Sequence, residues 1–267
     1  MYKAVFIDMD GTLLKNDHSV SEVNKQAIHK LQKKGVMVVP ISARPLHGMA
    51  HIIKNVVTDD TPLVSLNGGY IVHKKEVIFE DAVPLTEVAG VHKELKNFDV
   101  SAMYYSQMEW FAESATDRIK KEQRITPVKI NIQPFNTTLH YWEAHQKGPN
   151  KILIAGEKHL IHDIELRLIE LHQGNLNIFK SQSTYLEVMS TGASKAKAIE
   201  FLIGRYGIDK KEIIAIGDNF NDKGMIEFAG IGVAMGNAPE EIKAVANYVT
   251  DTNNNDGVAK ALHHFYN

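Results

Sequence analysis

The chain contains no cysteine among its 267 residues, so disulfide bonds and thiolate metal sites are excluded and a reducing cytoplasm suits it. It has no excess of positive charge, because 30 Lys and Arg residues face 32 Asp and Glu residues. We therefore expect neither a nucleic acid nor an anionic membrane as partner. No apolar run approaches the ~18 residues of a membrane-spanning helix. These absences predict a soluble, cytoplasmic protein. Separately, we expect a monomer or a weak homodimer.

Both ends of the sequence alternate between short apolar strands and amphipathic helices. Strands are predicted over residues 4–7, 36–41, 63–66, 213–216, 231–234 and 248–249. Short apolar strands separated by helices favour an α/β fold with a doubly wound parallel sheet, similar to the Rossmann arrangement.

Two of the predicted helices carry end signals in the sequence. Ser19, with Glu22 three residues later, predicts the N-terminal end of the first helix as a capping box. Ser194 predicts the start of a later helix, and Gly207 predicts its end.

The middle of the chain lacks this regular alternation. Strand patterns over residues 100–105 and 151–155 mix with helix patterns over 86–95 and 159–171. At ~150 residues per domain, the length suits about two domains. We therefore predict a core made of residues 1–83 and 184–267, interrupted by an inserted α+β domain over residues 84–183.

Acidic residues follow two of the apolar strands. Asp8 and Asp10 come directly after the first strand, and Asp218 and Asp222 follow strand 213–216. The carboxyl ends of parallel strands meet at one edge of a sheet, so these carboxylates can converge. Several oxygens without His or Cys suit a hard octahedral cation, and the pattern predicts a Mg²⁺ site.

A hydroxyl and a lysine accompany these carboxylates. Ser42 follows the second predicted strand, and Lys195 lies near the start of a helix. Together with magnesium they form a clamp for a transferring phosphoryl group. A carboxylate is a competent nucleophile toward phosphorus, and a second one two residues on can protonate the leaving alkoxide and later deprotonate water.

With these motifs the chain resembles the haloacid dehalogenase-like (HAD) superfamily, and within it the Cof-type phosphatases, over essentially its whole length. The four matching motifs are Asp8-x-Asp10-Gly11-Thr12, Ser42, Lys195 and Gly217-Asp218-x-x-Asn221-Asp222. The insertion between the second and third motifs is similar to the large α/β (C2-type) cap of this family. Two departures are Ser42-Ala43-Arg44 where Thr-Gly-Arg is common, and Ala196 where Gly is frequent.

The resemblance implies a role for each motif residue. Asp8 would be the nucleophile and a magnesium ligand, and Asp10 would be the acid/base and give its backbone carbonyl to the metal. Asp218 would bind magnesium, with Asp222 as a second-sphere or water-mediated partner. The residues expected to contact phosphate or substrate are Met9, Ser42, Ala43, Lys195 and Asn221.

The expected function is Mg²⁺-dependent hydrolysis of small phosphorylated metabolites, sugar phosphates above all, through phospho-Asp8. The alternative within enzymes is a sugar phosphomutase or phosphotransferase with the same nucleophile. A receiver-type signalling domain is disfavoured by Asp10 and by the long insertion, since a receiver needs a long-lived phosphoaspartate. A metabolite-binding protein without turnover is disfavoured by the complete motif set.

Several other residues admit two interpretations. Arg44 and His47 either reach substrate or pair with a surface acid, and the loop 67–69 is either a plain turn or a substrate contact. His159 and His162 are better explained as residues of a surface helix than as ligands of a zinc site. The inserted domain offers candidates for substrate selection that are individually better explained by core packing or a solvated face: Tyr104, Tyr105, Trp110, Arg118 and Lys129.

Overall fold

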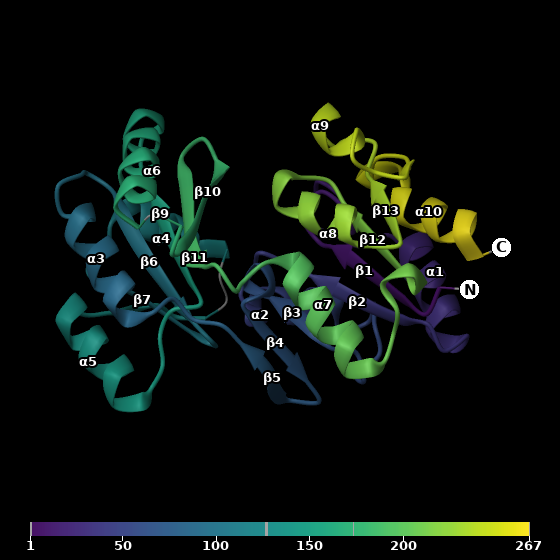
Figure 1. The fold of residues 1–267 in the computed structure, drawn as a ribbon, viewed down its shortest axis with the longest axis horizontal. Coiled ribbons are helices and arrows are strands. Elements are labelled where there is room, and N and C mark those ends of the chain that lie inside the picture. The colour runs from purple at the N-terminus through teal and green to yellow at the C-terminus, as the bar shows by residue number, and fades with distance from the viewer. Residues whose placement is uncertain (1, 126–127, 173, 267) are drawn as a thin grey trace. The chain divides into compact units, whose positions relative to one another are not determined.

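The computed structural model describes residues 2–125, 128–172 and 174–266. The chain divides into two compact units. The core unit comprises Met1–Arg44, Met49–Ile78 and Ser194–Asn267, and the inserted unit comprises Pro45–Gly48 and Phe79–Ala193. In Figure 1 the core unit therefore takes the colours of both ends of the scale, and the inserted unit those of its middle.

The core unit is built on an eight-stranded sheet in the order β14-β13-β12-β1-β2-β3-β4-β5. Neighbouring strands from β14 to β3 are parallel, and β4 runs antiparallel to β3. The strands are β1 (Ala4–Asp8), β2 (Met37–Ile41), β3 (Leu63–Ser65), β4 (Tyr70–His73), β5 (Glu76–Glu80), β12 (Ile213–Gly217), β13 (Ile231–Ala234) and β14 (Tyr248–Val249). This sheet confirms the predicted α/β class and its parallel core.

Helices lie on both sides of this sheet, as a doubly wound fold requires (Figure 1). On one side α1 packs against α10, and on the other α7 packs against α8. The α-helices are α1 (Glu22–Lys33), α2 (Leu46–Ile53), α7 (Lys195–Tyr206), α8 (Lys223–Phe228), α9 (Glu240–Lys243) and α10 (Gly257–Tyr266). Short 3₁₀ helices are η1 (Leu66–Gly68), η2 (Lys210–Glu212), η3 (Phe220–Asp222) and η4 (Asn253–Asn255).

The predicted helix ends are confirmed for α7, and the predicted N-terminal end of α1 is wrong. Ser194 caps α7 through its side chain, and Gly207 ends that helix in the left-handed conformation, as predicted. The prediction for α1 was wrong, because its N-cap is Ser21, whose hydroxyl accepts the N–H of Asn24 at 3.1 Å. Ser19 instead donates both its backbone N–H and its hydroxyl to Asp17, which removes it from the capping position.

The inserted unit has a six-stranded sheet of its own, in the order β10-β11-β9-β6-β7-β8. Neighbouring strands within this sheet are antiparallel, except for β7 and β8, which are parallel. The strands are β6 (Ser101–Ser106), β7 (Glu109–Ala112), β8 (Asn131–Ile132), β9 (Lys151–Ala155), β10 (Leu176–Gln182) and β11 (Tyr185–Ser190). The helices are α3 (Leu85–Leu95), α4 (Asp117–Ile125), α5 (Phe135–His145) and α6 (Lys158–His172).

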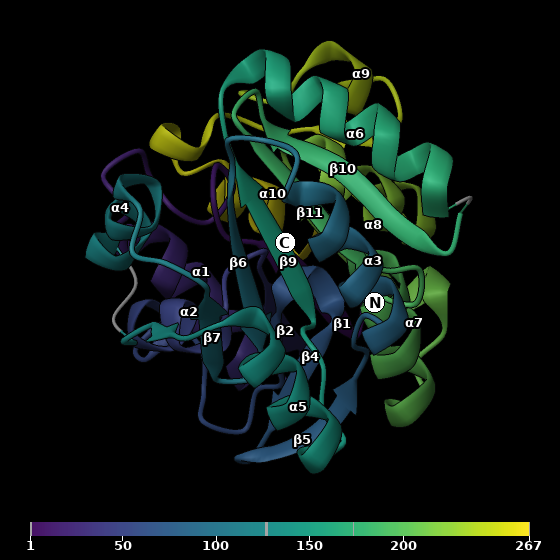
Figure 2. The same cartoon turned by 90° about the vertical axis from the view of Figure 1, so that its left-hand side faces the viewer.

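One face of this second sheet carries the core of the inserted unit. The apolar sides of α3, α5 and α6 pack on it through Val91, Trp142 and Ile164. On the sheet, alternate residues such as Ile152 and Ile154 of β9 point toward these helices. Figure 2 shows the three helices in front of the strands. No helix in the described part of the chain combines the length and the apolar character needed to cross a membrane.

Candidate active site

The register of three core strands brings the predicted motifs to one edge of the sheet. In β1, Asp8 pairs with Ile41 of β2, so Ser42 follows directly beside it. On the other side, Ile7 pairs with Ile216 of β12, which places Gly217 and Asp218 at the same level. Because all three strands are parallel, residues about 200 positions apart in the sequence meet at the carboxyl edge of the sheet.

Three carboxylates gather at this edge. Asp8, Asp218 and Asp222 each offer an oxygen, and these atoms lie within 4.8 Å of one another. Asp8 and Asp222 are buried and Asp218 is half-buried. Oxygen donors of this kind suit a hard divalent cation, so the residues present fit the metal that the sequence predicts.

A buried lysine bridges two of the three carboxylates. Lys195, the first residue of α7, donates from its Nζ to Asp8 Oδ1 and, at 2.5 Å, to Asp222 Oδ1. The other oxygen of Asp222 accepts the backbone N–H groups of Asp218 and Asn219 at 2.9 and 3.0 Å. Asp222 is therefore satisfied by protein donors, whereas Asp8 and Asp218 hold oxygens that a cation can use.

The electrostatics of the cluster reflect this crowding. Burial raises the pKa of Asp8 well above its usual value, Asp222 and Asp218 add to the rise, and Lys195 opposes it. Burial likewise raises the pKa of Asp218 to about 6, against the hydrogen bond from Thr12. Burial alone would lower the pKa of Lys195, but Asp222 and Asp8 outweigh it and hold the lysine charged. The site thus carries more negative than positive charge and favours a cation.

The turn after β1 contacts the carboxylate cluster through Asp218. Thr12 donates its hydroxyl to Asp218 Oδ1 at 2.7 Å. Gly11 has φ +80°, and a Cβ there would stand 2.3 Å from Asp218 Oδ2. Only glycine allows this backbone to lie so close to the carboxylate. The motif that contains Gly11 and Thr12 was predicted from the sequence, whereas their contacts with Asp218 were not.

Asp10 lies outside the carboxylate cluster and has a different partner. Arg44 Nε donates to Asp10 Oδ2 at 2.7 Å, and Arg44 Nη2 donates to Asp10 Oδ1 at 2.6 Å. His18 Nδ1 stands 3.3 Å from the same Arg44 Nη2. Of the two interpretations left open for Arg44, the structure shows the acidic pairing, and the acid is Asp10. These two residues are 34 positions apart, and no sequence pattern predicted their pairing.

The remaining predicted contacts occupy the same loops. Ser42 is buried, and its hydroxyl accepts the backbone N–H of Arg44 at 3.1 Å, while Ala43 between them is half-buried. Met9 is buried, and its carbonyl accepts the N–H of Leu14 at 2.8 Å, which closes the turn.

Asn221 donates its side-chain amide to Asn67 Oδ1 at 3.1 Å. Asn67 is itself buried and left-handed, with φ 52°, so the loop after β3 supports the loop after β12. The signal for Asn67 was its position directly after a strand, which the sequence analysis noted without naming a partner.

The candidates for substrate selection in the inserted unit lie in different surroundings. Tyr104, Tyr105 and Trp110 are buried in its interior. Arg118 pairs with Asp99 and Glu157. Lys129, like His159 and His162 on α6, is exposed, and His162 pairs with Glu165 at 3.7 Å.

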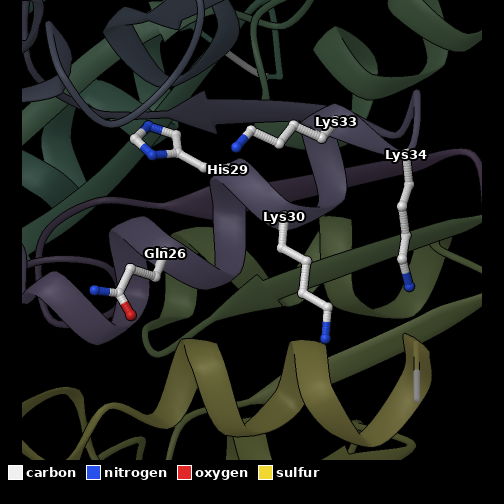
Figure 3. Close-up of a pocket in the computed structure, with 5 residues that line it drawn as sticks. All are labelled: Gln26, His29, Lys30, Lys33 and Lys34. Atoms are coloured by element: carbon white, nitrogen blue, oxygen red, sulfur yellow. The ribbon is translucent and has the colours of Figure 1, made fainter.

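A surface hollow of ≈450 Å³ lies along α1 and contains none of the predicted site residues. Its lining is basic, and Figure 3 shows the side chains extending from α1 and from the residue after its end: Gln26, His29, Lys30, Lys33 and Lys34. All five are exposed, and in the described part of the chain no ion pair joins them to an acid. This is a solvated helix face separate from the carboxylate edge.

A parallel α/β core with carboxylates and a lysine at its carboxyl edge is typical of proteins that act on phosphoryl groups. The family model of haloacid dehalogenase-like hydrolases matches residues 5–262, and the chain belongs to this family. Its activity is accordingly that of a HAD-superfamily phosphatase or phosphotransferase. The resemblance expected from the motifs is confirmed.

Relatives cover the chain almost completely. A protein of Haemophilus influenzae is 38% identical over 265 residues, which are 98% of this chain and 97% of the relative. The 5-amino-6-(5-phospho-D-ribitylamino)uracil phosphatase of Bacillus subtilis is 31% identical and covers 98% of this chain and 95% of its own length.

Solved structures of other HAD proteins have the same fold as this chain. A haloacid dehalogenase-like hydrolase from Bacteroides thetaiotaomicron superposes with a TM-score of 0.89 at 32% identity, covering all of both chains. A sugar phosphatase of HAD subclass IIB superposes with a TM-score of 0.82 at 26% identity, covering 98% of each chain.

Proposed function

We propose that the protein is a Mg²⁺-dependent phosphatase that hydrolyses small phosphorylated metabolites through a phospho-Asp8 intermediate. The observation that carries this proposal is the contact of Lys195 with both Asp8 and Asp222 in a buried site. A buried carboxylate held by a lysine, beside the Asp218 carboxylate that can share a cation with it, suits a nucleophile toward phosphorus.

The residues at the carboxyl edge divide the work of the first step. Asp8 attacks phosphorus and displaces the alkoxide, which gives an aspartyl-phosphate. Lys195 and the Ser42 hydroxyl hold the phosphoryl oxygens, and Asn221, steadied by Asn67, adds an amide donor. Asp8, Asp218 and the backbone carbonyl of Asp10 would hold Mg²⁺, which when bound supplies positive charge against the oxygens of the phosphoryl group.

Asp10 is assigned the proton transfers. It gives a proton to the oxygen of the leaving alcohol in the first step and takes one from the attacking water in the second. The second step cleaves the bond between phosphorus and Asp8, so Asp8 is regenerated and inorganic phosphate is released. Asp222 is not assigned a chemical step, because its oxygens are used by Lys195 and two backbone N–H groups.

The names of one relative and one structural neighbour support the proposed substrate class. One relative acts on a phosphorylated ribitylaminouracil and one structural neighbour is a sugar phosphatase, so sugar-like phosphate esters are the class to test first. We assign the inserted unit the role of a cap that sets specificity. Its support is the chain connection, since the unit ends at Ala193, two residues before Lys195.

The test is phosphate release from a panel of sugar phosphates and 4-nitrophenyl phosphate, with Mg²⁺ and with chelator. Asp8→Asn removes the nucleophile, and release should fall roughly 10³-fold or more while the thermal unfolding transition is retained. Undiminished turnover in this variant would remove Asp8 from the chemistry. Isomerised hexose phosphate in place of free phosphate would instead make the enzyme a mutase.

A further inference from the structure

The side chain of Asp10 is held by a two-point contact with Arg44. The guanidinium donates from Nε and Nη2 to the two oxygens of the carboxylate, at 2.7 and 2.6 Å. This fork fixes both the plane of the carboxylate and its side-chain rotamer, which a single hydrogen bond does not do. Asp10 remains 44% exposed, so no packing would hold it without this contact.

Arg44 is itself anchored at the site. Its backbone N–H donates to Ser42 Oγ at 3.1 Å, and its carbonyl accepts the N–H of Leu66 at 3.0 Å. His18 Nδ1 lies 3.3 Å from Arg44 Nη2 and 3.9 Å from Asp10 Oδ1, on the outer side of the pair. The arginine therefore links the loop that carries Ser42 to the loop that carries Asp10.

We propose that Arg44 is the positioning residue for Asp10, and that it sets the geometry from which Asp10 exchanges protons with the leaving group and with water. This inference rests on the proposed function and deepens it. A proton can be transferred only when the carboxylate lies within hydrogen-bond reach of the reacting oxygen, and small displacements reduce the rate strongly. A half-exposed aspartate without Arg44 would sample several rotamers, few of them in reach.

This role differs in its consequences from direct binding of the substrate phosphate by Arg44. An alkyl phosphate needs a proton on its leaving oxygen, whereas 4-nitrophenolate departs without one. Loss of a residue that acts through Asp10 must therefore harm alkyl phosphates more than 4-nitrophenyl phosphate. Loss of a phosphate-binding residue would harm both equally and would raise KM for both.

The experiment compares the wild-type protein with Arg44→Ala, Arg44→Lys, Asp10→Ala and the double variant Arg44→Ala/Asp10→Ala. The matched control is Arg167→Ala, because this exposed arginine of α6 also pairs with carboxylates, those of Glu94 and Glu170. For each, kcat and KM are measured with the best sugar phosphate of the panel. The burst of 4-nitrophenolate is measured in a single turnover, which reports the first step even when Asp10 is absent.

We expect Arg44→Ala to lower kcat on the sugar phosphate at least ~10-fold, with KM and the nitrophenolate burst changed less than ~3-fold. Arg44→Lys keeps the charge but loses the fork, so it should restore little. In the Asp10→Ala background the further change to Arg44→Ala should lower kcat on the sugar phosphate by less than ~2-fold, because the partner of Arg44 is already gone.

Two results would overturn the proposal: an equal loss on both substrates, or an additive effect of Arg44→Ala in the Asp10→Ala background. Either would make Arg44 a substrate-binding residue. Thermal unfolding of each variant separates these outcomes from misfolding. Full activity of Asp8→Asn would refute the proposed function itself, whereas an inactive Asp8→Asn with additive Arg44 effects would refute only this inference.

Discussion

Lys195 Nζ lies 2.5 Å from Asp222 Oδ1, and the two side chains are 1% and 0% exposed. The lysine contacts Asp8 as well, so it has two carboxylate partners in the interior. Because Asp222 shares the positive charge of Lys195, the lysine neutralises Asp8 only partly. The second-sphere or water-mediated role toward magnesium that the family resemblance implied for Asp222 stays a prediction, and the structure shows its direct contact with Lys195.

Replacing the buried lysine should destabilise the core unit. In Lys195→Met, Asp8 and Asp222 lose the positive charge that offsets their burial, and breaking such a pair from one side costs about 3–5 kcal/mol. Denaturant unfolding at neutral pH without divalent cations measures this loss. Lys197→Met, an exposed position on the same helix, should change the free energy of unfolding by less than about 0.5 kcal/mol. Equal stability of the two variants would contradict the pairing.

Asp218→Asn should weaken the binding of magnesium. The amide keeps the hydrogen bond from Thr12 but offers the cation a neutral oxygen, so more Mg²⁺ is needed for half-maximal activity, by roughly tenfold or more. A Mg²⁺ titration of phosphate release measures the shift. Asp60→Asn, an exposed acid of the core unit, serves as the control with an unchanged titration. An unshifted curve for Asp218→Asn would remove this residue from the metal site.

Gly11 and Gly35 form a matched pair for testing the turn after β1. Both have φ +80°, but a Cβ at Gly11 would meet Asp218 Oδ2 at 2.3 Å, whereas a Cβ at Gly35 would meet nothing within 4 Å. Alanine at either position costs roughly 1–2 kcal/mol from the left-handed backbone. Only Gly11→Ala should also displace the carboxylate and lower activity and Mg²⁺ affinity. The comparison uses unfolding together with the Mg²⁺ titration, and similar activity losses at both glycines would contradict the close approach.

The raised pKa of Asp218 predicts a pH dependence of stability in chelator. This pKa is about 6 in the folded chain, against an ordinary value of 3.8, so between these values the folded state binds more protons than the unfolded state. The stabilisation is complete below the ordinary pKa and is lost as the pH rises through about 6.

Asp218→Asn cannot ionise and escapes this loss. The free energy of unfolding of the variant, relative to that of the wild type, should therefore increase from about pH 4 to about pH 7. Denaturant unfolding of both proteins at the two pH values gives the difference. Added Mg²⁺ should reverse the gain, because it binds the ionised wild-type site. A difference that does not change with pH would mean that Asp218 titrates normally.

Much of the fold was predictable from local pattern. The apolar runs that form β1, β2 and β12 are buried along their length except for the first residue of β2. Asp8 ends β1 and Asp218 directly follows β12, so both had to appear at the sheet edge. The parallel order of the strands then brought Asp8 and Asp218 together. Ser194 and Gly207 marked the ends of α7 for equally local reasons, because capping depends on neighbours within a few residues.

The tertiary structure alone decided which of these residues pair. Arg44 could meet any surface acid, and only the placement of the loops after β1 and β2 selects Asp10. In the same way, the packing of α7 against α8 and η3 makes Asp222 a direct partner of Lys195. The left-handed loop after β3 gives Asn221 its partner Asn67. A charge pattern lists possible partners, but a contact requires distances of a few ångströms, which depend on the assembled sheet and loops.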